Sequence, residues 1–373
     1  MLILQIITGA LTFIYSIFIL YLTIGALRTK TSKYKNSFKV SLIIPFRNEQ
    51  KNLERCLLSI LNQSYESNLI EIILIDDHST DSSDLIAQKF DKYKNVKYLS
   101  LNNVLPHVSG KKAAIEYGIK NSTGEIIVTT DADCWHDKYW IENLISSFDS
   151  DTGFVAGPVI YANQKNIFQK LQTLEFGSLV AIGSAMINNK NPLIANGATC
   201  AYRRELFYDV NGFQDNSALV SGDEEFLMQK IHFQTKKIVK FCYLEDSLTY
   251  TDACVSLSDF LNQRMRWVSK VRYYRNKLML LPLSLIYLFY FSLGVLFICS
   301  LFSISVLKIF LAVFFTKMIL DFIFLSVSFR YLTLQKYLSY IPIAELLHIP
   351  FIIIIPALGY LKKFVWKGRT FAR

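Results

Sequence analysis

Several features are scarce in this 373-residue chain. Charged residues make up only 19% of it, no internal repeat or low-complexity linker is visible, and its six cysteines form no Cys-x-x-Cys pair. With 52% hydrophobic residues the chain can bury a core, so it is not an intrinsically disordered protein. Because zinc-type cysteine spacing is absent, the cysteines are more consistent with free thiols in a reducing compartment.

The net charge of +10 comes from three short segments. Residues 28–39 contain five basic residues and no acidic one, residues 264–277 contain six basic residues, and residues 362–373 contain five. Elsewhere acidic residues outnumber basic ones. Each basic segment borders an apolar run, which favours a membrane surface as the partner and argues against nucleic acid.

The apolar runs predict membrane-spanning helices. Residues 1–27 carry no charge and are long enough to cross a bilayer core of about 30 Å. Because no basic segment precedes them and no small-residue cleavage site is obvious, we expect a retained N-terminal anchor and not a signal peptide. The C-terminal region 279–361 contains three further candidate spans, at about 280–304, 309–329 and 340–360. Three prolines interrupt the last one, so it is a candidate re-entrant or interfacial segment.

Residues 38–255 predict a soluble α/β domain, which the basic run before it places in the cytoplasm. Five strand-like runs are expected at Val40–Phe46, Glu71–Asp76, Val96–Leu101, Ile126–Thr130 and Phe154–Ile160. Helical stretches separate the first four, at Glu49–Leu61, Asp84–Phe90 and Lys111–Lys120. This alternation predicts a mostly parallel sheet covered on both faces, with ligands beyond the carboxyl ends of its strands.

Two of these strand ends carry paired acids. Asp76 and Asp77 suit recognition of a base or ribose, although a helix cap with turn acids explains them equally simply. Asp131 and Asp133 face the same way in an extended chain, so both could hold a divalent cation that also touches a diphosphate. A lone Asp-x-Asp motif occurs by chance about once in a chain of this length, so its place at a strand end gives it weight.

A third acidic group, Asp223-Glu224-Glu225, enters a helical pattern. The helix dipole favours acids in a first turn, which accounts for one or two of them. A carboxylate beside an acceptor hydroxyl could instead remove its proton as a leaving group departs. The residues alone do not distinguish which acid points inward.

Residues 256–278 predict an amphipathic helix that begins with capping-box spacing at Ser256 and Asp259. Four basic residues favour the headgroup region, namely Arg264, Lys270, Arg272 and Arg275. Gln263, Arg266 and Trp267 share one face and could grip a diphosphate and stack on a sugar ring. A helix that served only as an anchor would not need that set.

Ionisable residues also occur inside the candidate spans. Lys317 and Asp321 lie four residues apart in one span, and Glu345 and His348 lie three apart in another. Such groups are costly in a bilayer and usually face the interior of a helix bundle. An ion pair that fixes helix packing is the simpler explanation. The alternative is a groove for a lipid head or an emerging glycan.

Seven motifs in order resemble the membrane-bound family-two glycosyltransferases, a group that includes cellulose-, chitin- and hyaluronan-synthase-like enzymes and ceramide or hopanoid sugar transferases. The motifs are Ile44-Pro45-Phe46-Arg47-Asn48-Glu49, Asp76-Asp77-His78-Ser79-Thr80-Asp81, Gly110-Lys111-Lys112-Ala113-Ala114, Asp131-Ala132-Asp133, Asn196-Gly197-Ala198, Asp223-Glu224-Glu225 and Gln263-Arg264-Met265-Arg266-Trp267. The resemblance covers roughly residues 38–278 plus the flanking apolar segments. It implies a glycosyltransferase A-type, Rossmann-like fold and inversion at the anomeric carbon of a nucleotide sugar.

The resemblance also implies roles for individual residues. Pro45, Glu49 and Asp77 would line the uridine pocket together with the neighbouring Asp76 and with Lys112. Asp131 and Asp133 would hold the nucleotide and its Mg²⁺ or Mn²⁺. Gln263, Arg266 and Trp267 would close over the diphosphate and the acceptor. The family's base is usually the Asp of a Glu-Asp motif, and alignment of Leu227 places Glu224 at that position, with Asp223 as the second choice.

The expected protein is therefore a multi-pass inner-membrane transferase with a cytoplasmic catalytic domain and a basic tail over residues 362–373. Its partners would be a nucleotide-sugar donor, a lipid-linked or glycan acceptor and the membrane, without nucleic acid. Two alternatives are a processive polysaccharide synthase and a catalytically silent scaffold or glycan-binding subunit of the same fold. A transporter would need more spans than this chain offers unless it oligomerised. The small number of spans favours single or few additions.

Overall fold

The computed structural model describes residues 2–30, 33–35, 37–104, 110–214, 222–273, 280–361, 364–366 and 369–371. Residue contacts group the chain into two units. The sheet unit comprises Thr29–Asn163 and Met186–Ala253, and the helical unit comprises Met1–Arg28, Gln164–Ala185 and Cys254–Arg373. Residues 164–185 lie inside the sequence range expected for the cytoplasmic domain, yet they pack with the apolar helices.

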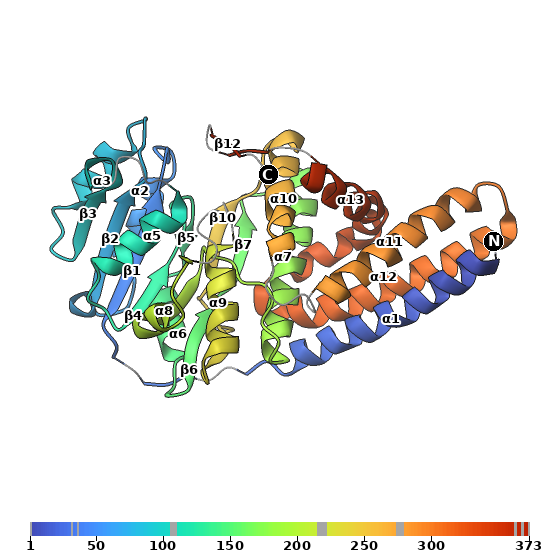
Figure 1. Ribbon diagram of the computed structural model, residues 1–373, viewed down its shortest axis with the longest axis horizontal. Helices are drawn as coiled ribbons and strands as arrows, with labels where there is room; N and C mark the ends of the chain where they lie inside the picture. The colour runs from blue at the N-terminus through green and yellow to red at the C-terminus, as the bar shows by residue number, and fades with distance from the viewer. Residues whose placement is uncertain are drawn as a thin grey trace. The chain divides into compact units, whose positions relative to one another are not determined.

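The sheet unit is built on a seven-stranded sheet of order β3-β2-β1-β4-β8-β6-β9 (Figure 1). Its strands are β1 (Val40–Phe46), β2 (Ile70–Asp76), β3 (Val96–Ser100), β4 (Ile126–Thr129), β6 (Thr152–Ala156), β8 (Cys200–Arg203) and β9 (Ile238–Phe241). β3, β2, β1 and β4 are parallel, whereas β8 pairs antiparallel with both β4 and β6. The mostly parallel sheet expected from the sequence is thus confirmed.

Helices cover both faces of this sheet. The helices of the unit are α2 (Leu53–Leu61), α3 (Ser83–Phe90), α4 (Leu101–Val104), α5 (Lys111–Lys120), α6 (Trp140–Ser146), α8 (Arg204–Asp209) and α9 (Asp223–Gln234). α2, α3 and α6 pack on one face around a fully buried apolar cluster. α5 packs on the other face, where Gly118 comes so close that a Cβ would meet Ile43 at 2.8 Å.

One predicted strand is wrong. Residues Phe154–Ile160 do not form a single strand, because Gly157 and Pro158 interrupt them. The chain instead leaves the large sheet after β6 and enters a three-stranded sheet of order β5-β10-β7, made of Trp135–His136, Thr249–Asp252 and Val159–Ala162. The helix expected from Glu49 also begins later, at Leu53, since residues 49–52 form a turn.

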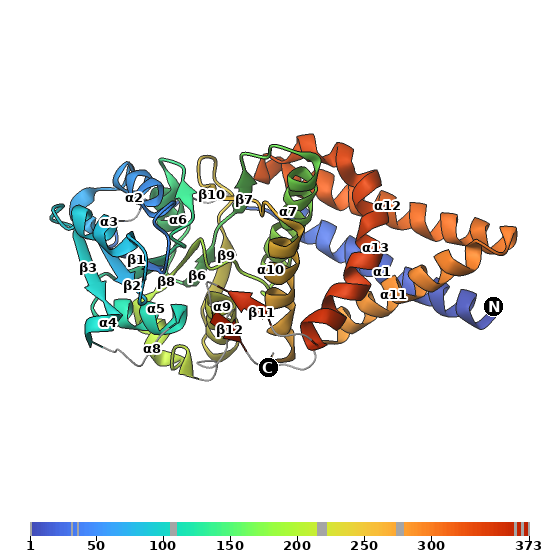
Figure 2. The same cartoon turned by 90° about the horizontal axis from the view of Figure 1, so that it is seen from above.

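Four apolar helices of the helical unit are long enough to cross a membrane, one N-terminal and three C-terminal. The helices of this unit are α1 (Leu2–Leu27), α7 (Ile167–Asn188), α10 (Leu257–Ser269), α11 (Leu280–Ser300), α12 (Ile304–Leu332) and α13 (Ile341–Leu361), and the short strands β11 (Phe364–Trp366) and β12 (Arg369–Phe371) follow. α1, α11 and α12 run alongside one another, whereas α13 runs across α11 and α12 and packs mainly on α10 (Figure 2). Pro350 and Pro356 lie within α13 without ending it.

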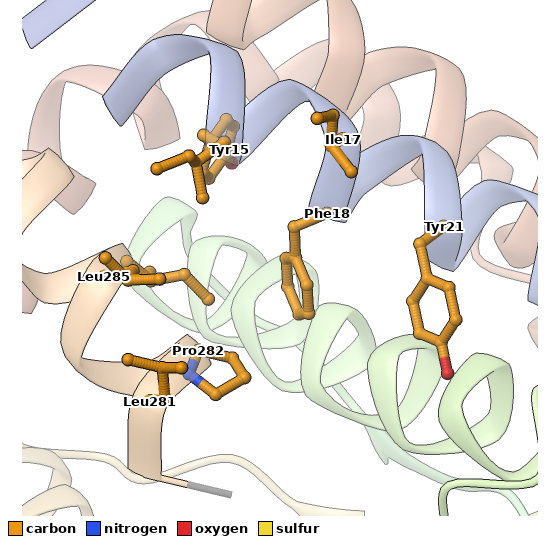
Figure 3. Close-up of a pocket in the computed structure, with 9 residues that line it drawn as sticks. Tyr15, Ile17, Phe18, Tyr21, Leu281, Pro282 and Leu285 are labelled. Atoms are coloured by element: carbon orange, nitrogen blue, oxygen red, sulfur yellow. The ribbon is translucent and has the colours of Figure 1, made fainter. Parts of the chain in front are cut away.

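A cavity of about 280 Å³ lies between α1 and α11. Side chains from both helices line it, including Phe18 and Tyr21 of α1 and Leu285 of α11 (Figure 3). Its lining contains no charged side chain. It therefore offers no group that could neutralise a diphosphate.

The amphipathic helix predicted over residues 256–278 is α10, which ends at Ser269. The Ser256 hydroxyl caps it by accepting a hydrogen bond from the Asp259 N–H at 3.0 Å, as the capping-box spacing predicts. Protein covers part of its apolar stripe, because Phe260 and Met265 are buried and Phe260 contacts the rings of Phe168 and Phe351, whereas Leu257 is exposed. Residues 274–278 of the predicted helix and part of the basic tail lie outside the described residues.

Candidate active site

Two loops at the carboxyl ends of β1 and β2 are tied to each other by side chains. Asn48 has a left-handed backbone (φ 53°), and its side-chain oxygen accepts a hydrogen bond from the Thr80 N–H at 2.8 Å. The Asn48 N–H donates to the Ser79 hydroxyl at 3.1 Å. The Glu49 N–H donates to the Ser83 hydroxyl at 2.7 Å. These contacts fix the loop that follows β1 against the loop that follows β2.

Pro45 lies in β1 where only one neighbouring strand pairs with it. β4 pairs with β1 as far as Ile43, and Pro45 pairs only with Ile75 of β2. Proline has no N–H to donate, so it is tolerated beyond the last residue pair on the β4 side. The open edge of β1 at Pro45 therefore faces the loops that carry the predicted donor-binding residues.

Asp76 and Asp77 are both buried at the end of β2. Asp77 accepts a hydrogen bond from the Gly110 N–H at 3.0 Å, and its other oxygen lies 3.1 Å from Nδ1 of His78. Burial raises the pKa of the Asp76 carboxyl, while a hydrogen bond from the Ser79 N–H at 3.0 Å opposes that shift. Asp77 therefore links β2 to Gly110 at the start of α5.

Lys111 on α5 joins two of the predicted acids. Its ammonium Nζ lies 2.6 Å from Asp131 Oδ1 and 3.8 Å from Glu224 Oε2. Burial disfavours the charged ammonium, but the carboxylates of Asp131, Glu224 and Asp223 together raise its pKa above the ordinary value. Asp131 and Glu224, 93 positions apart in the sequence, thus share one cation.

The motif resemblance predicts Lys112 as the residue near the donor and gives Lys111 no role of its own. In the structure the Lys112 ammonium lies 3.5 Å from Asp223 Oδ1, at the start of α9. Burial lowers the pKa of Lys112, and the carboxylate of Asp223 works against that shift. The two adjacent lysines therefore serve different acids, which the sequence could not show because both lie in one helical turn.

Glu224 is buried in the first turn of α9, after Gly222 with a left-handed backbone (φ 84°). Burial raises the pKa of its carboxyl, and the Lys111 ammonium lowers it, with a net rise above the ordinary value. Its Oε1 atom accepts no hydrogen bond within the described part of the chain. An unsatisfied, partly protonated carboxyl of this kind is suited to accept a proton.

Gly197 packs directly against the Glu224 carboxylate. A Cβ atom at this position would overlap the Glu224 carboxylate, so a larger residue here would require that carboxylate to move. The Thr130 hydroxyl holds this segment by donating to the Ala198 carbonyl oxygen at 2.8 Å, and it also lies 3.0 Å from Nε2 of His136. The Asn196-Gly197-Ala198 motif thus contacts the Glu224 carboxylate through Gly197.

Asp131 and Asp133 follow β4, and both side chains are partly exposed. Asp133 Oδ1 lies 3.6 Å from the thiol of Cys134. No group of three or more His, Cys, Asp or Glu side chains in the described part of the chain is placed to hold a metal ion. Two carboxylates leave coordination positions for ligand oxygens, which fits Mg²⁺ or Mn²⁺ bound together with a diphosphate.

Gln263, Arg266 and Trp267 lie on α10, which belongs to the helical unit. The sheet unit therefore brings together Asp77, Lys111, Lys112, Asp131, Asp223 and Glu224, while the roles of the α10 residues stay predictions.

Lys111 and Gly197 were missed as individual functional residues. A glycine inside a motif was the available signal, because a close approach of another group is one reason for a glycine.

A family model of glycosyl transferase family group 2 matches residues 126–359, more than half of the chain. The chain belongs to this family. A second model, of glycosyl transferase family 2, matches residues 41–210. Both matches agree with the family resemblance of the seven motifs, and that identification is confirmed.

Two curated relatives match part of the chain. Glycosyltransferase AglE of Haloferax volcanii is 29% identical over 196 residues, which are 50% of this chain and 58% of that protein. A hyaluronan synthase of Streptococcus pyogenes is 25% identical over 244 residues, which are 62% of this chain and 57% of that protein. The chain thus spans less than two thirds of the length of these relatives.

A solved structure covers nearly all of the chain. The mannosyltransferase PcManGT from Pyrobaculum calidifontis, in complex with GDP-Man and Mn²⁺, is similar with a TM-score of 0.61 and 17% identity. The likeness covers 93% of this chain and 99% of that one. It confirms the glycosyltransferase A-type fold expected from the sequence.

Proposed function

We propose that this chain is a membrane-bound inverting glycosyltransferase that moves a sugar from a nucleotide-sugar donor to a hydroxyl of a lipid or glycan acceptor. The observation that carries the proposal is the shared ammonium of Lys111, which contacts both Asp131 and Glu224. A predicted donor-binding acid and the predicted base thereby lie in one cluster. Such a cluster suits a single displacement, which needs charge neutralisation on one side and a base on the other.

In this proposal Glu224 removes the proton from the acceptor hydroxyl. The acceptor oxygen then forms a bond to the anomeric carbon, the bond to the diphosphate breaks, and the nucleoside diphosphate leaves. Lys111 contacts Asp131, the acid proposed to bind the donor. Its positive charge would therefore stabilise the leaving diphosphate of a donor bound beside Asp131. No second carboxylate nucleophile is needed, because one displacement inverts the anomeric centre. Asp223, paired with Lys112, is the second choice for the base.

Asp77, together with Pro45, Glu49 and Asp76, is assigned to the base and ribose of the donor. Asp131 and Asp133 would hold a divalent metal, which, when bound, neutralises charge on the diphosphate. The complex of PcManGT with GDP-Man and Mn²⁺ supports both a nucleotide-sugar donor and a metal of this kind. The resemblance of the motifs implies a uridine pocket, so UDP-sugars and GDP-sugars both belong in the test.

Membrane vesicles containing the full chain, supplied with a panel of UDP- and GDP-sugars, test the proposal. Asp133→Asn and Glu224→Gln should each abolish metal-dependent release of the nucleoside diphosphate while the protein still inserts and folds. Asp151→Asn, which changes an exposed acid of the same unit, is the matched control and should keep wild-type release. Turnover at the wild-type rate in both site variants would contradict the proposal.

A further inference from the structure

Arg264, the second residue of the Gln263-Arg264-Met265-Arg266-Trp267 motif, is buried with 3% of its surface exposed. The sequence predicts that Arg264 lies among lipid headgroups with its basic neighbours, and for Arg264 that prediction is wrong. Its Nε lies 3.0 Å from Oε1 and 3.1 Å from Oε2 of Glu175 on α7, and its Nη2 contacts the same carboxylate. A buried guanidinium needs such a partner, because an unpaired charge there would be very costly.

The same guanidinium contacts two of the three residues that the motif assigns to the acceptor and diphosphate. Its Nη1 donates to the side-chain oxygen of Gln263, and its central carbon lies 4.2 Å from the ring centroid of Trp267. The guanidinium of arginine is a rigid plane of N–H donors. Because Nε and Nη2 are paired with Glu175, the direction in which Nη1 donates is fixed as well. Gln263 and Trp267 therefore both contact a guanidinium that is paired with Glu175, and the Trp267 ring centroid also lies 5.7 Å from that of Phe176 on α7.

The attachment of α10 to α7 does not depend on this pair alone. Gln172, one turn before Glu175, donates to the Cys254 carbonyl oxygen at 3.0 Å and accepts from the Cys254 N–H at 3.1 Å. Gln172 therefore holds the backbone that leads into α10, and these two hydrogen bonds involve none of the motif side chains. Gln172 thus holds the backbone of Cys254, whose thiol lies 3.7 Å from Oε1 of Gln263, whereas Glu175 holds the guanidinium that contacts both Gln263 and Trp267.

We propose that Glu175 and Arg264 form a positioning pair that holds the Gln263 amide and the Trp267 ring in the arrangement required to bind the diphosphate and the acceptor. This inference rests on the proposed function, in which the motif binds those groups. Glu175 is not part of any motif identified in the sequence. Its role follows from its contact with Arg264, and it acts only through that residue.

Three variants of the full chain, purified in the same detergent, test the pair. Glu175→Gln removes the charge that fixes Arg264, and Arg264→Lys keeps the charge but loses the planar fork. We expect kcat to fall roughly 100-fold in Glu175→Gln and at least about tenfold in Arg264→Lys, with a higher KM for the acceptor, because small misplacements of binding groups are costly. Gln172→Ala is the matched control and should lower the melting temperature while kcat stays within about twofold.

A second readout does not depend on turnover. The emission of Trp267, obtained as the difference between each protein and the same protein carrying Trp267→Phe, should shift in Glu175→Gln and not in Gln172→Ala. The pair is refuted if Trp267 emission is unchanged in Glu175→Gln, or if kcat falls in all three variants in proportion to their melting temperatures. If the wild type transfers no sugar from any donor, the proposed function fails instead, and the emission measurement still decides whether the pair orients Trp267.

Discussion

At the scale of single residues, Glu224 is held in surroundings that oppose its ionisation. It is buried, and its Oε1 atom accepts no hydrogen bond in the described part of the chain. The Lys111 ammonium is the cation that the structure places against it. A carboxyl balanced in this way keeps its proton to a higher pH than an exposed glutamate, and it can take up a proton from a substrate near neutral pH.

The first prediction concerns pH. Activity should rise with pH as Glu224 loses its proton, with a midpoint above the ordinary glutamate value of about 4.3. Lys111→Met should move that midpoint higher still, because the ammonium favours the charged carboxylate. The pH profile of kcat/KM, measured in both proteins, checks this. A midpoint at the ordinary value would remove Glu224 from the role of base.

The same shift has a consequence for stability. When the pKa is higher in the folded protein than in the unfolded chain, the folded state loses stability as pH rises through that interval. Glu224→Gln should therefore melt at a higher temperature than the wild type, by an advantage that grows between about pH 4.5 and pH 7 and is then constant. The gain is at most about 1.4 kcal/mol per pH unit.

The second prediction concerns the contact between Gly197 and the Glu224 carboxylate. Gly197→Ala adds a methyl group that overlaps the Glu224 carboxylate, so the base must move. We expect kcat to fall by roughly 10- to 100-fold, with little change in the KM for the donor. Gly9→Ala is the control, since no atom lies within 4 Å of the added methyl group. Unchanged kcat in Gly197→Ala would mean that Glu224 is not the group that reacts.

At the scale of helices and strands, four apolar helices meet at one polar cluster. Lys317 on α12 is fully buried and pairs with Asp321 at 2.8 Å and with Glu345 on α13. The Tyr15 hydroxyl of α1 donates to Asp321 at 2.6 Å, and the Tyr290 hydroxyl of α11 lies 3.0 Å from Nδ1 of His348 on α13. These contacts favour the packing explanation over a groove for a lipid head.

The third prediction separates those two explanations. Lys317→Leu leaves two carboxylates buried without their cation and should cost about 3–5 kcal/mol of stability. The triple variant Lys317→Leu, Asp321→Leu and Glu345→Leu removes all three charges and should recover most of that loss. Thermal melting and sugar transfer are measured on both. If the triple variant melts like the wild type but transfers no sugar, the cluster has a functional role beyond packing.

The elements themselves were largely predictable. The pattern of apolar residues predicts β1 and α5 at their observed bounds. A buried parallel strand is almost continuously apolar, whereas the apolar residues of a helix recur every three to four positions. The break at Gly157 and Pro158 was missed, since both flanking strands are apolar. The partners of Lys111 and Arg264 could not be predicted, because they come from segments distant in sequence.

At the scale of the whole molecule, the described chain has one sheet unit with the proposed chemistry and one helical unit with the apolar helices. The group that the seven motifs resemble includes both polysaccharide synthases and enzymes that add one sugar to a lipid, and the Gln-x-x-Arg-Trp set occurs in both. What differs is the amount of protein available to guide a growing chain. Here large side chains are fully buried in the helical unit, among them Leu22, Phe289, Lys317 and Phe329. The cavity between α1 and α11 measures only about 280 Å³.

The fourth prediction concerns the length of the product. A helix interior packed with side chains leaves little room for a long sugar polymer, so we expect one or a few additions per acceptor. Mass spectrometry of products, after membranes containing the chain receive each donor sugar with excess acceptor, measures the distribution. Glu224→Gln serves as the blank. A ladder of long products at low turnover would instead indicate processive synthesis, in which case further chains or segments must build the path for the polymer.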